Sequence, residues 1–365
     1  MGGRWYDGLL GMKAWAVVRN GQPLQCIELT GPVATGTEVV LDVTRCGVCH
    51  SDLHFWHGSY NMGGGKVMSL AERGVTLPRA PGHEIVGRVV AMGPDATGVA
   101  IGVAIGDERI VYPWIGCGHC ARCRAGEDNL CLAQRSLGVL ENGGFGAQVK
   151  VPHPRYLVAF DGLDASLAAT YACSGITVLS AIRKIMPLGP DEPVLLIGAG
   201  GLGLAAIAML RALGHRRIVS MDISADKLRA AVAAGATQTV DGQGDGAGAR
   251  ILAAAGGPVP AAIDFVNTSD TARTGLDALA KGGRLVLVGV AGGDLTLSLA
   301  TMIFRAQSVL GSNTGTVDDL RTVVALAQAG TLAATPVQEF PKDQANAALM
   351  ALQDGHITGR AVLVA

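Results

Sequence analysis

Charged and aromatic residues are scarce in this chain of 365 residues, making up only 16% and 4% of it. The formal net charge is −1 and no block of lysine or arginine occurs, so the chain lacks the positive surface that attracts nucleic acid. No uninterrupted apolar run reaches the ~18 residues of a membrane span, and residues 1–11 lack the apolar core of a signal peptide. The sequence therefore predicts a cytoplasmic protein that has neither nucleic acid nor a membrane as a partner.

Apolar residues and glycine are abundant instead. Apolar side chains make up 49% of the chain, and 52 residues are glycine. The apolar fraction is too high for a disordered chain, and the length is sufficient for two domains with their own cores. The glycines indicate many tight turns and close approaches between backbone segments.

Four of the eight cysteines lie close together, in the pattern Cys117-x2-Cys120-x2-Cys123-x7-Cys131. Thiols this close in a large chain without an export signal favour a metal site over disulfides. Zinc takes four tetrahedral ligands, and a closed set of four thiolates leaves no open position for a substrate. We therefore expect a structural zinc site here; the alternative is a reduced cysteine-rich loop.

Two patterns follow each other along the chain. Between Met12 and about Pro154, short β-rich runs are bounded by glycine and proline, which predicts a β-barrel or sandwich. After about Ser174, apolar strands alternate with helical segments, which predicts a parallel sheet with right-handed crossovers. The last β-rich run, from Ile357 to Val364, is expected to return to the first domain. The predicted fold class is therefore α/β.

A glycine-rich turn follows the apolar run from Val194 to Ile197 and opens a helical segment. In this turn, Gly198 would permit the tight bend, Gly200 would let a pyrophosphate approach the backbone, and Gly203 would let the helix pack on the strand. The helix N-terminus would offer free N–H groups to the phosphates. This context predicts a dinucleotide site rather than an ordinary turn.

An acidic residue, Asp222, ends the next predicted strand, about twenty positions after the glycine-rich turn, as such sites require. Its carboxylate is expected to accept hydrogen bonds from the ribose diol, and it would repel a 2′-phosphate. Because no arginine stands next to Asp222, we predict NAD rather than NADP as the cofactor. Lys227 is either a second ribose contact or an ordinary exposed helix lysine.

Further residues of metal-binding type are spread over three distant segments: Cys49-His50-Ser51-Asp52-Leu53-His54, Gly82-His83-Glu84 and Cys173-Ser174-Gly175-Ile176-Thr177. Two thiolates and one imidazole suit a catalytic zinc that keeps one open position. A zinc ion of this kind polarises an alcohol or carbonyl oxygen. Spacing alone, however, does not join residues so far apart in the chain.

Together these segments resemble the zinc-dependent medium-chain alcohol dehydrogenases. The matching pieces include the four-cysteine loop, the glycine-rich turn and Thr358-Gly359-Arg360, and they run in the family's order from about residue 12 to the C-terminus. The resemblance is strongest to the tetrameric NAD-dependent enzymes of yeast and archaeal type. It implies a GroES-like β-rich domain in two segments, residues 1–175 and 313–365, and a Rossmann domain, residues 176–312.

The resemblance implies a role for each residue of the metal site. Cys49, His83 and Cys173 would hold the catalytic zinc. Glu84 would lie behind the metal as a transient ligand, and Asp52 would hold the ring of His83. With the four-cysteine loop, the resemblance thus implies two zinc ions per chain.

The proton relay and the cofactor contacts are implied in the same way. Ser51 would bond the substrate hydroxyl and pass its proton to His54 near the solvent. His50 and Arg360 would contact the pyrophosphate, and Thr177 would lie against the nicotinamide. The residues expected at the cofactor are His50, Thr177, Gly198, Gly200, Gly201, Leu202, Gly203, Asp222, Lys227, Val288 and Arg360.

The substrate and the assembly are less well defined by the sequence. Tyr60, Trp114 and Leu140 match positions that line the substrate pocket in the resembled enzymes, or are ordinary core residues. They favour an apolar primary or secondary alcohol, oxidised to an aldehyde or ketone, over a charged substrate. The loop from Asn61 to Pro78 is expected to be either a flap over the pocket or a subunit contact. A sheet edge near Leu285 to Gly293 is expected to pair across subunits in a homodimer or homotetramer.

The remaining cysteines and histidines are assigned no ligand role. Cys26 and Cys46 are expected to be small buried thiols. The histidines outside the segments above are expected on the surface or in loops. They are His57, His119, His153, His215 and His356.

Two other functions remain open at this point. One is another zinc-dependent dehydrogenase or reductase of the superfamily, which acts on a different carbonyl, sugar or activated alcohol. The other is a zinc- and nucleotide-binding scaffold without turnover. Metal content and NADH formation with a panel of alcohols would distinguish these functions.

Overall fold

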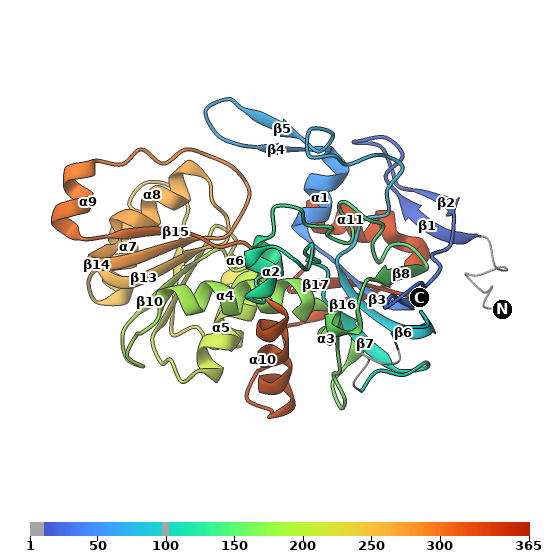
Figure 1. The fold of residues 1–365 in the computed structure, drawn as a ribbon. Coiled ribbons are helices and arrows are strands. Elements are labelled where there is room, and N and C mark those ends of the chain that lie inside the picture. The colour runs from blue at the N-terminus through green and yellow to red at the C-terminus, as the bar shows by residue number, and fades with distance from the viewer. Residues whose placement is uncertain (1–10, 97–101) are drawn as a thin grey trace.

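The computed structural model describes residues 11–96 and 102–365; apart from Gly11, the expected N-terminal extension lies outside this range. A β-rich domain lies at the right of Figure 1 and an α/β domain at the left. The strands are β1 (Met12–Ala16), β2 (Gln25–Leu29), β3 (Val39–Val48), β4 (Ser59–Asn61), β5 (Val67–Ser69), β6 (Glu84–Met92), β7 (Glu108–Val111), β8 (Gln148–Val151), β9 (Leu157–Val158), β10 (Val194–Ile197), β11 (Ile218–Asp222), β12 (Gln238–Asp241), β13 (Val259–Asp264), β14 (Leu279–Leu287), β15 (Ser308–Gly311), β16 (Val337–Pro341) and β17 (Arg360–Val364).

The helices include short 3₁₀ turns and one π-helical turn, η3. They are α1 (His50–His57), α2 (Ala121–Arg124), η1 (Asp128–Leu130), η2 (Pro154–Tyr156), α3 (Ala165–Thr170), η3 (Tyr171–Gly175), α4 (Ile176–Ile185), α5 (Gly201–Ala212), α6 (Ala225–Ala234), α7 (Ala247–Ala255), α8 (Ser269–Asp277), α9 (Leu299–Arg305), α10 (Val317–Gln328), η4 (Lys342–Gln344) and α11 (Ala345–Gln353).

A seven-stranded, largely antiparallel sheet forms the β-rich domain. Its order is β16-β17-β3-β6-β7-β9, with β8 also paired to β3. The central strand β3 is rich in valine, whose branched side chain packs well in strands. Strand β17 pairs antiparallel with β3, Ala361 opposite Val48 and Val364 opposite Arg45. The C-terminal segment therefore completes the first sheet, as the sequence predicted.

A six-stranded parallel sheet forms the second domain, in the order β12-β11-β10-β13-β14-β15. Numbered along the domain, this is the order 3-2-1-4-5-6 of doubly wound dinucleotide-binding folds. Strand β10 is buried throughout, as expected for a parallel strand that is covered on both faces. The glycine-rich turn follows β10 at the point where the strand order reverses, and ligands bind at this point in such sheets.

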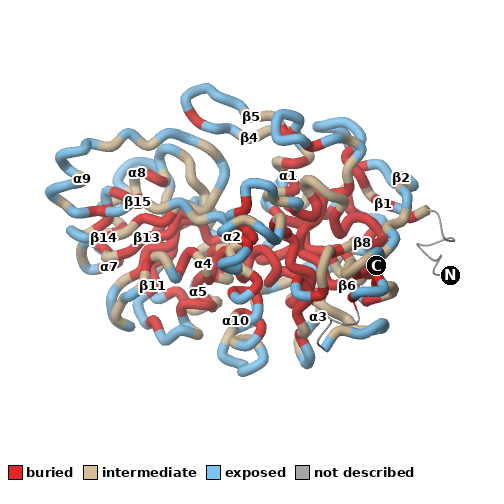
Figure 2. Tube along the Cα trace, viewed as in Figure 1, coloured by how far each residue is buried: buried red, intermediate tan, exposed pale blue. Residues whose placement is uncertain are grey.

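A continuous helical stretch, α3-η3-α4, links the two domains. It is the one described helix long and apolar enough to span a membrane by length and composition, over Ala165–Ile185, and 83% of its apolar window is buried inside the protein. Buried positions, red in Figure 2, fill both sheets and this stretch. One cluster of buried side chains includes Val43 of β3, Ile176 of α4 and Leu196 of β10. The shared core fixes the two domains against each other.

The predicted sheet edge near Leu285 is wrong. Strand β14 pairs with β13 on one side and with β15 on the other, so β15 is the edge strand on that side among the described residues. The four residues of β15, Ser-Val-Leu-Gly, are too few to show a clear alternation of apolar and polar side chains in the sequence.

One burial prediction is also wrong. Cys26 is exposed, because it lies in β2, which pairs only with β1 among the described residues. His215 lies in the loop after α5, as predicted, but it is buried there, where the N–H of Arg216 donates to the carbonyl of Pro190 at 2.8 Å. Cys46 is buried as predicted, whereas the remaining histidines assigned no ligand role are exposed or partly exposed.

Candidate active site

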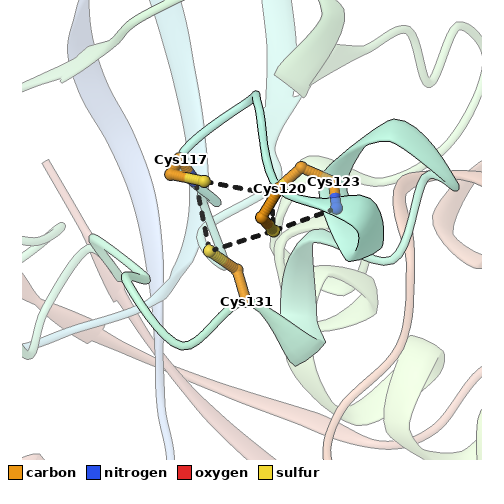
Figure 3. A group of neighbouring side chains, drawn as sticks. All are labelled: Cys117, Cys120, Cys123 and Cys131. Carbon is orange, nitrogen blue, oxygen red and sulfur yellow. Dashed lines mark hydrogen bonds between the residues drawn. The ribbon is translucent and has the colours of Figure 1, made fainter.

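The four-cysteine loop brings its sulfur atoms together around one point (Figure 3). The Sγ atoms of Cys117 and Cys123 are 3.9 Å apart, those of Cys120 and Cys123 are 3.5 Å apart, and those of Cys120 and Cys131 are 3.9 Å apart. Tetrahedral zinc with bonds of ~2.3 Å to sulfur places its sulfurs about 3.8 Å apart. The loop therefore fits a closed four-thiolate zinc site.

Local backbone groups favour the thiolate form, which zinc requires, at Cys117. The N–H groups of His119 and Cys120 lower the pKa of Cys117 to about 6, because they donate to its sulfur. The N–H of Cys117 in turn donates to Cys131 at 3.3 Å, and the N–H of Cys123 donates to Cys120 at 3.5 Å. These bonds hold the sulfurs in place before any metal binds.

Three distant residues of the second set also converge. The ligand atoms of Cys49, His83 and Cys173 lie within 4.8 Å of one another, and all three residues are buried. The contact with Cys173 lowers the pKa of Cys49 well below its ordinary value. Neither ring nitrogen of His83 has a hydrogen-bond partner among the described residues. Two thiols and a buried, unpartnered imidazole are the donor set of a catalytic zinc with one open position.

Asp52 organises the two ligand loops from behind. Its Oδ2 accepts from the N–H of Cys49 at 2.8 Å, and its Oδ1 accepts from the N–H of Gly82 at 3.0 Å. The same Oδ1 lies 3.5 Å from Nδ1 of His83. One carboxylate in the first turn of α1 thus holds the backbone of Cys49 and the loop before His83, and it faces the ring of His83.

Cys173 comes from the π-helical turn η3. The hydroxyl of Ser174 donates to the carbonyl of Thr170 at 2.8 Å within this buried turn. Such wide turns inside α-helices are frequent at functional sites. Trp114 closes the other side: its indole N–H donates to the carbonyl of Ala172 at 3.2 Å, and its ring lies 5.2 Å from that of His83. The indole therefore positions two ligands at once.

Glu84 and Arg360 form a buried ion pair beside the metal ligands, in which the guanidinium donates to Oε1 of Glu84. The second oxygen, Oε2, has no partner among the described residues. Burial raises the pKa of Glu84, although the charge of Arg360 opposes this rise. A Cβ atom on Gly201 would lie only 2.7 Å from Cδ of Arg360. Arg360 therefore lies between the metal ligands and the glycine-rich turn.

Positive charge gathers around His50, close to Arg360. The surroundings of the His50 ring lower its pKa by desolvation, and the nearby charges of Arg360 and Lys227 lower it further. His50 begins α1, and Lys227 lies in the first turn of α6. Two cations and a helix N-terminus that face one region favour an anionic ligand such as a pyrophosphate.

The glycine-rich turn has the geometry that a pyrophosphate site needs. Gly198 has a φ angle of +94°, which L-residues with a side chain rarely adopt. A Cβ atom on Gly203 would lie 2.0 Å from the carbonyl oxygen of Gly198, whereas one on Gly200 would meet nothing within 4 Å. The helix is thus packed tightly on the strand, and open space remains above Gly200. Leu202, the next position of the expected site, is only partly buried.

The other expected cofactor residues lie on several elements, and Asp222 is the one that bonds to the turn itself. The carboxylate of Asp222 accepts from the N–H groups of Ala199 at 2.8 Å and Ser224 at 2.9 Å, so it is fixed beside the turn. The hydroxyl of Thr177 is buried and has no partner among the described residues. Val288 directly follows β14, and its N–H donates to the carbonyl of Asp264 at 2.9 Å.

Ser51 and His54 lie one turn apart on α1, which puts them on the same face of the helix. The ring of His54 stacks on Tyr60, with ring centres 4.9 Å apart. Burial lowers the pKa of His54, and repulsion by His50 and His57 lowers it further. His54 is therefore neutral, and able to accept a proton, at a lower pH than an ordinary histidine.

A cleft of about 480 Å³ opens between the two domains, lined by Ser51, Tyr60 and Trp114 from one domain and by residues such as Asn267 and Val290 from the other. Leu140, the third residue expected in the pocket, does not line it. Its neighbour Val139 does, and Leu140 packs against the core instead.

The loop from Asn61 to Pro78 contributes to this cleft, as the flap alternative expects. The hairpin β4-β5 reaches towards the α/β domain (Figure 1), and the N–H of Gly64 donates to Asp294 of that domain at 2.5 Å. Two charged residues, Arg73 and Asp294, line the cleft. Sequence reasoning named neither residue. The flap alternative covered the loop that holds Arg73 but did not single out Arg73, and nothing in the local pattern placed Asp294 at the substrate.

Comparisons with known proteins agree with this arrangement. The alcohol dehydrogenase GroES-like domain matches residues 35–161, and the zinc-binding dehydrogenase family matches residues 201–329. An NAD-dependent alcohol dehydrogenase of Sulfurisphaera tokodaii is 34% identical over 355 residues, covering 97% of this chain and 100% of that protein. A D-arabinose 1-dehydrogenase (NADP(+)) of Saccharolobus solfataricus is 32% identical, covering 96% of this chain and 97% of that protein.

A solved structure gives the same result. The alcohol dehydrogenase of the hyperthermophilic archaeon Aeropyrum pernix superposes with a TM-score of 0.87 at 29% identity, and the match covers 97% of this chain and 100% of that one. The predicted fold class, the oxidoreductase class and the cofactors NAD and zinc are thereby confirmed. The chain therefore belongs to the zinc-dependent alcohol dehydrogenase family, with a GroES-like domain and a Rossmann domain.

Proposed function

We propose that the protein catalyses reversible hydride transfer between an apolar primary or secondary alcohol and NAD, giving an aldehyde or ketone and NADH. The observation that carries this proposal is the convergence of Cys49, His83 and Cys173 behind Trp114, which contacts the ring of His83 and lines the cleft. The same cleft is bordered by the α/β domain that bears the glycine-rich turn. A Lewis acid and a hydride acceptor can thus reach one substrate carbon.

When bound, zinc supplies Lewis acidity towards the substrate oxygen, and NAD supplies the hydride acceptor. The protein's own residues orient the substrate and move its proton. Ser51 lines the cleft and accepts the proton of the substrate hydroxyl, and His54 on the same helix face carries it towards the solvent. Trp114 and Tyr60 exclude water from the reacting carbon. In the reverse direction, the two relay residues return the proton to the carbonyl oxygen.

NAD rather than NADP fits the carboxylate of Asp222. Two backbone N–H groups hold this carboxylate beside the glycine-rich turn, where it would repel a 2′-phosphate. The similarity to a D-arabinose 1-dehydrogenase (NADP(+)) makes a direct test worthwhile. We expect kcat/KM to be higher with NAD, and an equal or higher value with NADP would contradict this assignment.

The decisive experiment combines metal analysis with NADH absorbance over a panel of alcohols. We expect two zinc ions per chain and turnover of apolar alcohols. A second candidate is a dehydrogenase of sugars or other polyhydroxylated substrates, which the polar side chains of Gln134, Asn267 and Thr268 in the cleft wall favour. Turnover of sugars in preference to simple alcohols would establish that candidate. Zinc without any turnover would contradict both.

A homo-oligomer is the assembly that we propose, as a dimer or a tetramer. The apolar side chains of Leu299, Ile303 and Phe304 on α9 are 77%, 74% and 77% exposed. A patch of this kind on one short helix is typical of a surface that pairs with another subunit. We also propose a cytoplasmic location, because none of the eight cysteines, all of which lie in the described residues, forms a disulfide, and a reducing compartment keeps thiols in this state.

A further inference from the structure

Arg73 is an exposed, charged residue at the wall of the substrate cleft. It lies in the segment between β5 and β6, and it lines the same cleft as Ser51, Tyr60 and Trp114. The guanidinium carbon lies 5.9 Å from the centre of the Tyr60 ring. Because Tyr60 also stacks on His54, Arg73 is only one aromatic ring away from the proton relay.

The guanidinium of Arg73 has no ion pair or hydrogen bond with any other residue that the structure describes. The neighbouring acid, Glu72, is turned away, because its carboxylate accepts from the N–H of Ser69 at 2.8 Å. Asp294 is the other charged residue of the cleft wall. Its carboxylate accepts from the N–H of Gly64 at 2.5 Å and makes no ion pair with Arg73. The donors of Arg73 are therefore free for a ligand.

The chemistry of this group selects the ligand. A guanidinium presents several N–H donors in a flat fork that matches the two oxygens of a carboxylate. The cation–π contact with Tyr60, at 5.9 Å from the ring centre, keeps the guanidinium near the ring without using its N–H donors. A substrate with its hydroxyl at Ser51 and a carboxylate at its far end would fill the cleft and satisfy Arg73.

We propose that the cleft takes alcohols and aldehydes whose chain is apolar near the reacting carbon and ends in a carboxylate, which Arg73 binds. This inference rests on the proposed function and specifies the far end of the substrate. It departs from the expectation from sequence that charged substrates are disfavoured. That expectation considered Tyr60, Trp114 and Leu140 alone.

The test compares ω-hydroxy acids of increasing chain length with 1-alkanols of matching length, at low ionic strength. With the zinc-loaded enzyme and NAD, we expect kcat/KM at the best chain length to favour the hydroxy acid. In Arg73→Met, the ratio of hydroxy acid to alkanol should fall about tenfold, the loss expected for a charge-assisted hydrogen bond. In Arg73→Lys, this ratio should lie between those of the wild type and Arg73→Met, because lysine keeps the charge but lacks the flat set of N–H donors.

Lys66→Met is the matched control. Lys66 is exposed in the turn between β4 and β5, in the same loop from Asn61 to Pro78 as Arg73. It does not line the cleft, so its loss removes the same charge from the same loop. We expect the ratio of hydroxy acid to alkanol to stay at the wild-type value in this variant. If this ratio falls equally in Arg73→Met and Lys66→Met, the effect comes from general electrostatics and the role of Arg73 is overturned. A wild-type enzyme that does not prefer the hydroxy acid over the alkanol would also overturn it.

Calorimetric titration of the same hydroxy acids into the protein holding zinc and NAD separates this inference from the proposed function. Absence of alkanol turnover contradicts the proposed function. Hydroxy-acid affinity that Arg73→Met leaves unchanged contradicts the role of Arg73. Affinity that falls about tenfold in Arg73→Met supports the carboxylate site whether or not the alkanols react.

Discussion

At the scale of single residues, Asp52 has the widest influence on the metal site. It accepts hydrogen bonds from the backbone of Cys49 and of Gly82 and also faces the ring of His83. Loss of the carboxylate frees both ligand loops at once and leaves two backbone N–H groups without a partner. The donor atoms themselves are unchanged, so the effect is on their placement.

We therefore predict that Asp52→Ala weakens zinc binding at the three-ligand site about 10- to 100-fold, the range for residues that orient metal ligands. Competition with a chelator, followed by metal analysis per chain, measures this loss. The four-cysteine loop is the internal control, because its zinc should be retained. Equal release of both metals would indicate general unfolding, and unchanged affinity would refute the positioning role.

His54 gives a prediction about pH. Burial and the neighbouring histidines lower its pKa, so the neutral base is present at neutral pH and somewhat below. In His54→Gln, the proton has no acceptor and must leave directly to the solvent, which becomes easier as the pH rises. We expect alcohol oxidation to slow about tenfold near neutral pH, with the difference shrinking above about pH 8.

The measurement is kcat as a function of pH for the wild type and for His54→Gln, with alcohol and NAD saturating. The difference should also shrink at acidic pH, because the wild-type histidine is itself protonated below its lowered pKa. Parallel pH profiles at all pH values would rule out His54 as the end of the relay. NADH binding serves as a check that the variant is folded.

At the scale of elements, two glycines of the turn between β10 and α5 serve different purposes, one in packing and one in ligand binding. Gly203 is needed by the fold, because a Cβ atom there would overlap the carbonyl of Gly198, whereas the space above Gly200 is open. The backbone at Gly200 has a φ angle of −75°, which alanine adopts without strain. The open space is therefore reserved for the ligand and not for packing.

We predict that Gly200→Ala leaves Tm close to the wild-type value but weakens NADH binding at least about tenfold, because the methyl group occupies the space of the pyrophosphate. Gly203→Ala should lower both Tm and NADH affinity, because the helix must move away from the strand. Fluorescence titration with NADH and thermal unfolding give the two readouts. Full NADH affinity in Gly200→Ala would place the pyrophosphate elsewhere.

At the scale of the whole molecule, the exposed apolar face of α9 is the feature that the monomer does not explain. Its side chains Leu299, Ile303 and Phe304 are largely exposed. The predicted sheet edge at Leu285 lies inside the sheet, and β15 is the edge strand on that side of the described sheet. The helix α9 and β15 are joined by only two residues, and we expect them to belong to one interface.

Phe304→Asp should shift the protein to a smaller species in size-exclusion chromatography with light scattering, because a buried charge destabilises an apolar interface. Val33→Asp is the control, since Val33 is also exposed, at 69%, but lies far from α9 in the β-rich domain. A wild-type protein that elutes as a monomer would remove the basis of the proposed assembly. An oligomer that is unaffected by Phe304→Asp would exclude this surface.

Signals carried by neighbouring residues were interpreted correctly from the sequence. The spacing of the four cysteines predicted a cluster that the structure contains, since a loop of so few residues cannot separate its ends. The glycine-rich turn likewise predicted a strand, a bend and a helix in the right order. The prediction that Cys26 is buried was wrong, because the exposure of its side chain depends on which strands pair with β2 and not on the sequence of β2 itself.

The sequence by itself determined two local units, the four-cysteine loop and the dinucleotide turn, because each depends on bond geometry over a few residues. The order of these and the other motifs along the chain also identified the family. Only the tertiary structure decided that Cys173 meets Cys49 from a π-helical turn, that Trp114 contacts His83 and that Arg73 faces the cleft. Such contacts depend on how distant elements pack around a shared core, and no local pattern encodes that packing.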